Sequence, residues 1–410
     1  MNVAARHILI VGAGHAGGVA AATLRQTGFT GAITLIGGEA HPPYERPPLS
    51  KELLAGAIPV EKTYLRPLAF YTENGIAFRP GETAVAIDRA AQRVELANGD
   101  TVPYDALLLT LGARARRLAL PGADHPRVLY LRDIVDSLAL REHLNTGARI
   151  AVIGAGFIGL EAAAVARKHG AAVTVLEVQR EPLQRVCAPE IGRFMATLHR
   201  RNGVNLRTGV AVVAIEEKGG ALEIRTADGE TVAADIVLAG IGAQPNVELA
   251  HAAGLAVEDG IVTDEFGRTS DPNVFAAGDV TRHFNPLLGR KLRLEAWQNA
   301  QNQAMAVAKV MAGGDRPHAE VPWFWTDQYD VNLQIAGAPK RWDDLVWRGG
   351  PDDKAFTVFA MQDGKPVAAT TMNNGREMRP AREMIARGRA VDPARLADAK
   401  VKLQDLARET

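Results

Sequence analysis

The sequence predicts an α/β fold with two Rossmann-like dinucleotide-binding domains and a smaller C-terminal α+β domain. The first observation is that a short apolar run followed at once by a glycine motif occurs twice, at residues 8–18 and 150–159. The second is a change after residue 320, where aromatic residues gather between alternating apolar runs. Two similar units and one different unit are therefore expected.

The first glycine motif has the context that dinucleotide binding requires. Residues 8–11 are all apolar, as in a strand buried on both faces of a parallel sheet. A second strand is expected at residues 32–36, and Glu39 follows it where a carboxylate reaches a ribose hydroxyl. The helix that begins after the motif would point its N–H groups at a pyrophosphate. The motif glycines are Gly12, Gly14 and Gly17.

The pattern then recurs. Residues 150–153 form another apolar run before a glycine motif and a helix, and a strand at residues 172–176 ends at Glu177. Hairpin turns are expected at residues 99–100 and 228–229, one in each unit. This internal repeat indicates two related folding units, each with a β-meander.

The chain is expected to return to the first unit after the second. Residues 274–276 read as a strand and residues 297–311 as a helix. The last unit is expected to hold an antiparallel sheet and a basic pair of helices. The predicted domains are residues 1–113 with 245–320, residues 114–244, and residues 321–410.

Composition excludes several classes of protein. The 47 basic and 47 acidic residues balance, so the net charge of the chain does not favour binding to nucleic acid or a membrane. No apolar run has transmembrane length. Residues 1–7 lead directly into the first strand without a leader pattern, which predicts a cytoplasmic protein. The single cysteine, Cys187, excludes an intrachain disulfide and a cluster of thiolate ligands, and is expected to be a buried or partly exposed small hydrophobe.

Three segments carry a resemblance to a known family. They are PYERPPLSK at residues 43–51, TSDPNVFAAGDV at 269–280 and WFWTDQ at 323–328. Together they resemble the flavoprotein ferredoxin reductases of bacterial oxygenase systems. The resemblance implies a glutathione-reductase-like fold, with FAD in the first domain and NADH in the second.

The resemblance also implies the FAD contacts. Glu39 would bind the adenosine ribose, while Arg46 and Lys51 match positions at the flavin end of FAD. The alternative for Arg46 and Lys51 is a solvated basic loop. Trp297 matches a position whose backbone lies near the flavin ring, and Asp279 ends a buried strand where an uncompensated carboxylate would be costly. The remaining expected FAD contacts are Gly12, Gly14, Ala16 and Gly17 at the pyrophosphate, together with Ala84 and Arg132.

The second site is expected to bind NADH. A carboxylate at Glu177 accepts hydrogen bonds from a 2′-hydroxyl and repels a 2′-phosphate, so NADH should be preferred over NADPH, although Arg180 and Arg185 lie nearby in sequence. Glu161 matches a family glutamate that pairs with the lysine at the position of Lys51 beside flavin N5. A solvated carboxylate on the helix surface is the alternative for Glu161. The expected cofactor-binding residues of this site are Gly154, Gly156, Ile158, Gly159, Glu177 and Gly242.

The implied activity is hydride transfer from NADH to flavin N5, followed by single-electron transfer to a [2Fe–2S] ferredoxin that feeds a P450 or Rieske oxygenase. Lys51 and Glu161 are the expected catalytic residues, setting local charge, with no obligatory acid or base. Dithiol reductases of this fold need two redox cysteines, which this chain lacks. The alternatives are an NADH-dependent reductase for rubredoxin, a nitrite reductase or a quinone, and a redox-responsive binding module resembling apoptosis-inducing factor.

The ferredoxin of such a system is expected to be acidic, and a basic run near the C-terminus offers a complementary surface. A solvated helix face is the alternative for this run. Trp323 and Trp325 are expected either to help cover the flavin or to pack the last domain. The basic run consists of Arg376, Arg379, Arg382, Arg387 and Arg389.

Overall fold

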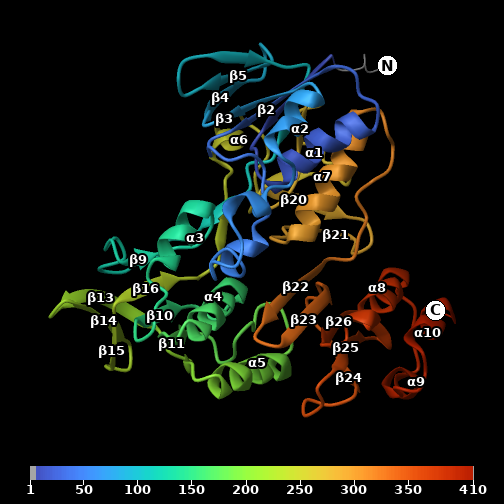
Figure 1. Cartoon of the computed structure of the whole chain (residues 1–410). Helices are drawn as coiled ribbons and strands as arrows, with labels where there is room; N and C mark the ends of the chain where they lie inside the picture. The colour runs from blue at the N-terminus through green and yellow to red at the C-terminus, as the bar shows by residue number, and fades with distance from the viewer. Residues whose placement is uncertain (1–5, 410) are drawn as a thin grey trace. The chain divides into compact units, whose positions relative to one another are not determined.

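The computed structural model describes residues 6–409, which form two compact units (Figure 1). Unit 1 comprises Met1–Arg46, Val60–Arg114 and Ala243–Glu320, and unit 2 comprises Pro47–Pro59, Ala115–Gly242 and Val321–Thr410. Residues 47–59, expected in the first domain, thus group with unit 2, and the division into three ligand-defined domains stays a prediction. Residues 1–7 were expected to lack a leader pattern, and residues 1–5 of this segment lie outside the described residues.

Unit 1 is built on a parallel sheet whose strands run in the order β19-β7-β1-β2-β3. Helices α1 (His15–Gln26) and α7 (Trp297–Met311) pack together on one core of this sheet, since Ala20, Leu24 and Val307 share a single buried cluster. Small alanines on both helices let them approach closely. The strands are β1 (His7–Val11), β2 (Ala32–Gly37), β3 (Ile76–Pro80), β7 (Ala106–Leu109) and β19 (Val274–Ala276).

A second core of unit 1 lies under the predicted meander. Val94 and Val102 of the meander share a buried cluster with Leu9 and Leu107 of the parallel sheet. The predicted hairpin at residues 99–100 is confirmed, because β5 and β6 pair antiparallel around it. The other elements are β4 (Ala84–Asp88), β5 (Arg93–Leu96), β6 (Thr101–Pro103), β8 (Ala113–Ala115), β17 (Ala243–Pro245), β18 (Ile261–Thr263), β20 (Thr281–Asn285), β21 (Arg290–Leu292), α2 (Leu68–Glu73), α6 (Glu248–Ala252) and the 3₁₀ turn η2 (Val60–Thr63).

Unit 2 repeats the pattern, with a parallel sheet in the order β12-β11-β10-β16-β9 and a meander of β13, β14 and β15. The predicted hairpin at residues 228–229 joins β14 to β15. The internal repeat is therefore confirmed at the level of topology. The elements are η1 (Pro47–Ser50), β9 (Val128–Leu129), α3 (Ile134–Arg141), β10 (Arg149–Ile153), α4 (Phe157–Lys168), β11 (Ala172–Glu177), α5 (Pro189–Arg201), β12 (Asn205–Thr208), β13 (Val212–Lys218), β14 (Ala221–Thr226), β15 (Thr231–Ala234) and β16 (Ile236–Ala239).

The C-terminal part of unit 2 has the expected antiparallel sheet, in the order β22-β23-β26-β25-β24. Three helices follow within the described residues, where a pair was expected. The additional helix is α9, only five residues long, which begins at Pro393 after an Asp392 cap that accepts the Ala394 N–H. The elements are β22 (Trp323–Gln328), β23 (Val331–Gly337), β24 (Asp344–Arg348), β25 (Phe356–Gln362), β26 (Lys365–Met372), η3 (Gly375–Glu377), α8 (Met378–Arg387), α9 (Pro393–Ala397) and α10 (Leu403–Glu409).

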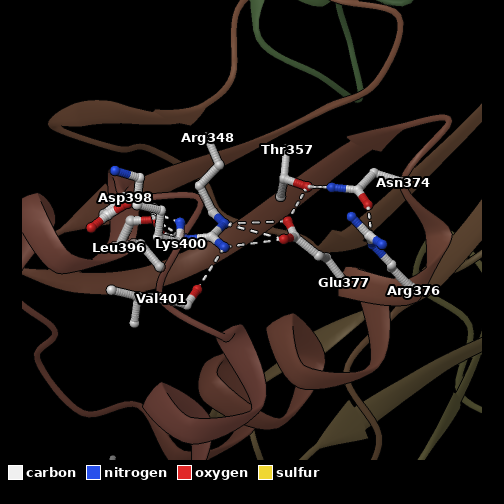
Figure 2. A network of polar contacts seen from close by, with 9 residues as sticks. All are labelled: Arg348, Thr357, Asn374, Arg376, Glu377, Leu396, Asp398, Lys400 and Val401. Carbon is white, nitrogen blue, oxygen red and sulfur yellow. Dashed lines mark hydrogen bonds and ion pairs between the residues drawn. The ribbon is translucent and has the colours of Figure 1, made fainter.

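A buried guanidinium ties these helices to the sheet (Figure 2). The side chain of Arg348 is 3% exposed, and its Nη2 lies 3.1 Å from Glu377 Oε1. Glu377 also accepts the hydroxyl of Thr357 at 2.6 Å, so its carboxylate is held from two strands. The remaining N–H groups of Arg348 donate to backbone carbonyls of α9 and of the segment between α9 and α10. The carbonyl acceptors are those of Leu396, Asp398 and Val401.

Candidate cofactor sites and the Lys51–Glu161 pair

The first glycine motif is shaped to hold a pyrophosphate. Gly12 has φ +109°, and a Cβ there would lie 2.3 Å from the Thr110 carbonyl oxygen, while a Cβ on Gly17 would lie 2.0 Å from the Gly12 oxygen. Gly14 differs, because the nearest atom to its Cβ position is Arg46 Nη2 at 4.0 Å. The first and third glycines are thus demanded by the turn and by helix packing, and the second leaves open space for a ligand.

Helix α1 starts at this turn without a protein cap. Its N-cap residue is Gly14, and no side chain of residues 6–409 caps the first N–H groups. Helix α4 of unit 2 starts in the same way at Gly156. Uncapped N–H groups with the positive end of the helix dipole are suited to phosphate oxygens, so both helix starts fit a dinucleotide.

Arg46 lies beside Glu39. Arg46 Nη2 is 3.0 Å from Glu39 Oε1, and the hydroxyl of Tyr44 donates to Glu39 Oε2 at 2.5 Å. The Arg46 guanidinium also lies 5.2 Å from the centre of the Tyr44 ring. The two residues expected at opposite ends of FAD are therefore neighbours, next to the open position at Gly14. Arg46 therefore lies near Glu39, the residue expected at the ribose, and near Gly14, the glycine expected at the pyrophosphate.

Asp279 follows β19 and is half-buried. Its charge, together with that of Arg46, acts on His15 at the start of α1. Burial is the main cause that lowers the pKa of His15 to about 4, so this imidazole is neutral at neutral pH. The His15 and Trp297 ring centres lie 5.2 Å apart, which places Trp297 at the same end of α1. The structure thus brings together the first glycine motif, Asp279 and Trp297.

The turn that carries Asp279 is fixed by a residue that sequence reasoning missed. Gln303 of α7 accepts the Gly278 N–H at 2.9 Å and the Thr281 hydroxyl at 3.0 Å through one oxygen. Gln303 is 1% exposed, so these bonds are made away from water. A glutamine in the middle of a helical run gives no sequence signal for such a role.

Two expected FAD contacts, Ala84 and Arg132, have interactions within the fold. Ala84 is the first residue of β4 and packs against the meander core of unit 1. Arg132 is half-buried in unit 2, just before α3, and its backbone N–H donates to Asp136 Oδ2 at 2.8 Å within the N-terminal cap of that helix. Their contacts with FAD stay predictions.

The second glycine motif repeats the geometry of the first. Gly154 has φ +104° and its Cβ would lie 2.5 Å from the Gly240 oxygen, while a Cβ on Gly159 would lie 2.2 Å from the Gly154 oxygen. At Gly156 the nearest atom is 4.0 Å away, so the second glycine is again the open one. Ile158 is 42% exposed beside it. This motif also fits a pyrophosphate.

Glu177 lies at the end of β11 and is buried. One carboxylate oxygen accepts the Ala155 N–H at 2.5 Å and the other accepts the Gln179 N–H at 2.8 Å. The carboxylate therefore fixes the glycine turn, and each oxygen keeps acceptor capacity for a ribose hydroxyl. Arg180 and Arg185 are exposed. Gly242 has φ +108° and open space at its Cβ position.

Lys51 and Glu161 form a buried ion pair in unit 2. Lys51 Nζ lies 3.0 Å from Glu161 Oε1, and the side chains are 14% and 4% exposed. Glu161 also accepts the hydroxyls of Ser50 and Thr326, each at 2.5 Å. Both alternatives, a helix-surface carboxylate for Glu161 and a solvated loop position for Lys51, are excluded by this burial. The two hydroxyls lie in the segments 43–51 and 323–328, but their role was missed because local sequence does not show that they meet Glu161.

Cys187 is buried, as expected, and its thiol lies 3.4 Å from the Leu183 carbonyl oxygen. Burial raises its pKa to about 12, which removes the thiolate form at neutral pH. Cys187 is therefore a packing residue.

The C-terminal arginines serve different contacts. Arg379 is exposed and pairs with Glu383, whereas the guanidinium of Arg382 lies 5.8 Å from the centre of the Trp323 ring. Trp323 in turn stacks on Trp325 with ring centres 5.4 Å apart. Arg387 donates to the carbonyl of Ala407 in α10, so part of the basic run stabilises the fold. Arg376 and Arg389 are exposed.

Comparison with known proteins identifies the family. The model of the pyridine nucleotide-disulphide oxidoreductases matches residues 6–304, and that of the reductase C-terminal domain matches residues 323–407. The chain belongs to the pyridine nucleotide-disulphide oxidoreductase family. Both the predicted fold class and the resemblance drawn from residues 43–51, 269–280 and 323–328 are confirmed.

Relatives in this family match along the full chain. The ferredoxin–NAD(+) reductase component of the anthranilate 1,2-dioxygenase system of Burkholderia cepacia is 44% identical, covering 97% of this chain and 98% of the relative. Rhodocoxin reductase of Rhodococcus erythropolis is 40% identical, covering 97% and 93%.

Solved structures of this family agree with the fold. The ferredoxin reductase for the CYP199A2 system of Rhodopseudomonas palustris has a TM-score of 0.94 at 38% identity, covering 98% of this chain and 100% of that one. The covalent complex of putidaredoxin reductase with putidaredoxin gives a TM-score of 0.95 at 37% identity, covering 98% of both chains. Within residues 6–409, no helix is long and apolar enough to cross a membrane.

Proposed function

We propose that this protein is an FAD-dependent NADH:ferredoxin oxidoreductase that supplies electrons to an oxygenase. The observation that carries the proposal is the pair of glycine cradles, at Gly14 and Gly156, each open where a pyrophosphate would lie and each followed by an uncapped helix. When bound, FAD accepts a hydride from NADH and returns electrons singly, as a [2Fe–2S] ferredoxin requires. Full-length similarity to ferredoxin reductases of oxygenase systems supports the same acceptor.

The first domain, residues 1–113 with 245–320, is proposed to hold FAD. The turn at Gly14 donates backbone N–H groups to the pyrophosphate, and Glu39 binds the adenosine ribose. Arg46 is assigned to the pyrophosphate, because it lies 3.0 Å from Glu39 and faces the open position at Gly14. Asp279 and Trp297 bind FAD near the start of α1, as do Ala16 and Gly17 of the motif. Ala84 and Arg132 are the remaining proposed contacts.

The second domain, residues 114–244, is proposed to hold NADH. Gly156 and Ile158 approach the pyrophosphate, and Glu177 accepts the ribose hydroxyls, which favours NADH over NADPH. The buried Lys51–Glu161 pair is proposed to fix the charge at flavin N5, with neither residue acting as an obligatory acid or base. Residues 321–410 form the third domain.

The acceptor is proposed to be an acidic [2Fe–2S] ferredoxin that docks on the C-terminal arginines. Of these, Arg376, Arg379 and Arg389 are exposed, so their charges can attract an approaching acidic partner, whereas Arg387 donates to α10. The rate of ferredoxin reduction should fall steeply with ionic strength, while NADH oxidation by a small neutral acceptor should not. Equal salt dependence of the two reactions would contradict this docking surface.

The experiment that tests the function is anaerobic reduction of the FAD-loaded protein by NADH, followed by mixing with [2Fe–2S] ferredoxin, rubredoxin or a quinone. The proposal predicts rapid flavin reduction and fastest reoxidation by ferredoxin. Fastest reoxidation by another acceptor would contradict the assignment. Slow reduction with a change in oligomeric state would indicate a redox-responsive binding module instead. A cytoplasmic location, where NADH is the available reductant, is part of the proposal.

A further inference from the structure

The Glu161 carboxylate is surrounded by donors from three separate segments. Ser50 at the end of η1 donates to Oε2, and Thr326 of β22 donates to Oε1, both at 2.5 Å. Lys51 approaches the same Oε1 at 3.0 Å. The two hydroxyl residues are at most 1% exposed, so both hydrogen bonds are shielded from bulk solvent. A buried carboxylate is tolerated only when its lone pairs are satisfied in this way.

The hydroxyl of Thr326 is itself oriented by a further buried chain. His199 Nε2 lies 2.7 Å from Gln328 Oε1, and Gln328 Nε2 lies 3.0 Å from Thr326 Oγ1. Burial lowers the pKa of His199, so its imidazole is neutral and donates from Nε2 to the glutamine oxygen. The glutamine amide then donates to Thr326. With its oxygen accepting from Gln328, the threonine has its proton left for Glu161.

Lys51 and Thr326 share one carboxylate oxygen, and this links the hydroxyl to the ammonium group. If the hydroxyl is removed, Lys51 becomes the sole donor to Glu161 Oε1 among residues 6–409, and the carboxylate draws the ammonium group toward itself. The position of the positive charge then changes although neither charged residue has been altered. Ser50 acts on the second oxygen and limits rotation of the carboxylate.

We propose that Ser50 and Thr326 are positioning residues of the hydride-transfer step, holding the Glu161 carboxylate so that the Lys51 ammonium group keeps one place beside the flavin. This rests on the proposed function, because it assigns the pair to flavin N5. It also gives the C-terminal domain, which carries Thr326, a direct part in setting the charge at the redox centre.

The test compares Thr326→Val, Thr326→Ser and Ser50→Ala with a matched control. Thr371→Val is the control, since Thr371 lies fully buried in the same sheet and its hydroxyl has no hydrogen-bond partner among the described residues. Each FAD-loaded variant is measured for the limiting rate of flavin reduction, the KM for NADH and the midpoint potential of the flavin at equilibrium. Urea unfolding shows whether each variant is folded.

Thr326→Val and Ser50→Ala should each lower the limiting rate about ten-fold, with KM for NADH unchanged and the midpoint potential more negative. Thr326→Ser should restore both quantities, and Thr371→Val should match the wild type in both. Folded Thr326→Val and Ser50→Ala variants with wild-type rate and potential would overturn the positioning role while leaving the proposed function intact. A wild-type flavin that NADH does not reduce would instead overturn the proposed function.

Discussion

Lys51 Nζ lies 3.0 Å from Glu161 Oε1, and both side chains are shielded from water, at 14% and 4% exposure. A pair so buried contributes little net stability, because the cost of removing both charges from water offsets their attraction. Its presence in the fold is therefore better explained by function. The proposed role is to fix charge where a hydride arrives, and this can be separated experimentally from any role in folding.

Glu161→Gln should lower the limiting rate of flavin reduction by NADH by about ten-fold or more. The amide keeps the shape of the side chain but removes the charge that fixes Lys51. The rate is measured by anaerobic stopped-flow absorbance of the bound flavin. Glu409→Gln is the control, because Glu409 pairs with Arg395 in an exposed bridge and should leave the rate unchanged. A wild-type rate in Glu161→Gln would remove the pair from the reaction.

Arg348→Met should lower the free energy of unfolding of the C-terminal part of unit 2 by about 3–5 kcal/mol, because Glu377 is left buried without its partner. Three backbone carbonyls also lose their donor. Urea unfolding followed by tryptophan fluorescence measures the change. Arg395→Met is the control, and the loss of its exposed pair with Glu409 should cost about 0–1 kcal/mol. Equal costs for the two variants would show that the network of Figure 2 is not a stability centre.

Acid should destabilise unit 1 through His283. Burial, and the nearby His318, lower the pKa of His283 from 6.5 to about 3, and the two ring centres lie 5.3 Å apart. The unfolded chain therefore binds the proton more readily than the folded one. The stability contributed by neutral His283 is complete above pH 6.5 and is lost as the pH falls toward 3.

The unfolding free energy should thus drop by roughly 1.4 kcal/mol per pH unit from this group below its unfolded pKa. In His283→Leu, the unfolding free energy should depend less steeply on pH, because one titrating group is removed. This holds whether or not the substitution changes stability at neutral pH. Urea unfolding at about pH 7.5 and pH 5.5 measures the difference. An unchanged pH dependence in His283→Leu would show that His283 is not the group that titrates.

Glu177→Gln should reduce the preference for NADH over NADPH about ten-fold, since the substitution removes the charge that repels a 2′-phosphate. The ratio of kcat/KM for the two coenzymes is the measurement. Glu181→Gln is a control on the same loop, because Glu181 pairs with Arg193 at 3.6 Å and should not affect the ratio. A ratio that is the same in both variants would assign coenzyme choice elsewhere, with Arg180 and Arg185 the nearest candidates.

The elements that sequence predicted best are those set by local pattern. The strand of residues 274–276 and the helix of residues 297–311 have the expected bounds, because continuous apolar runs and helical periodicity are properties of neighbouring residues. Helix α9 was missed, because five residues are too few for a periodic pattern to emerge. Its Asp392–Pro393 start was the available signal.

The candidate site was predictable only in part, because most of its contacts join residues that are far apart in sequence. Lys51 and Glu161 were paired through family resemblance, whereas Ser50 and Thr326 were not, since a hydroxyl that donates to a carboxylate 111 or 165 residues away leaves no trace in local sequence. The Arg348 network was missed likewise, because Glu377 lies 29 residues away and the other acceptors are backbone carbonyls that carry no residue identity.

The most direct test of the proposed NADH:ferredoxin oxidoreductase activity is to purify the protein, load it with FAD and mix it anaerobically with NADH while recording the visible absorbance of the flavin. One FAD should bind per chain, NADH should bleach it rapidly, and [2Fe–2S] ferredoxin should restore the colour by single-electron steps. A colourless protein that cannot be reconstituted with FAD, or a bound flavin that NADH leaves oxidised, would contradict it.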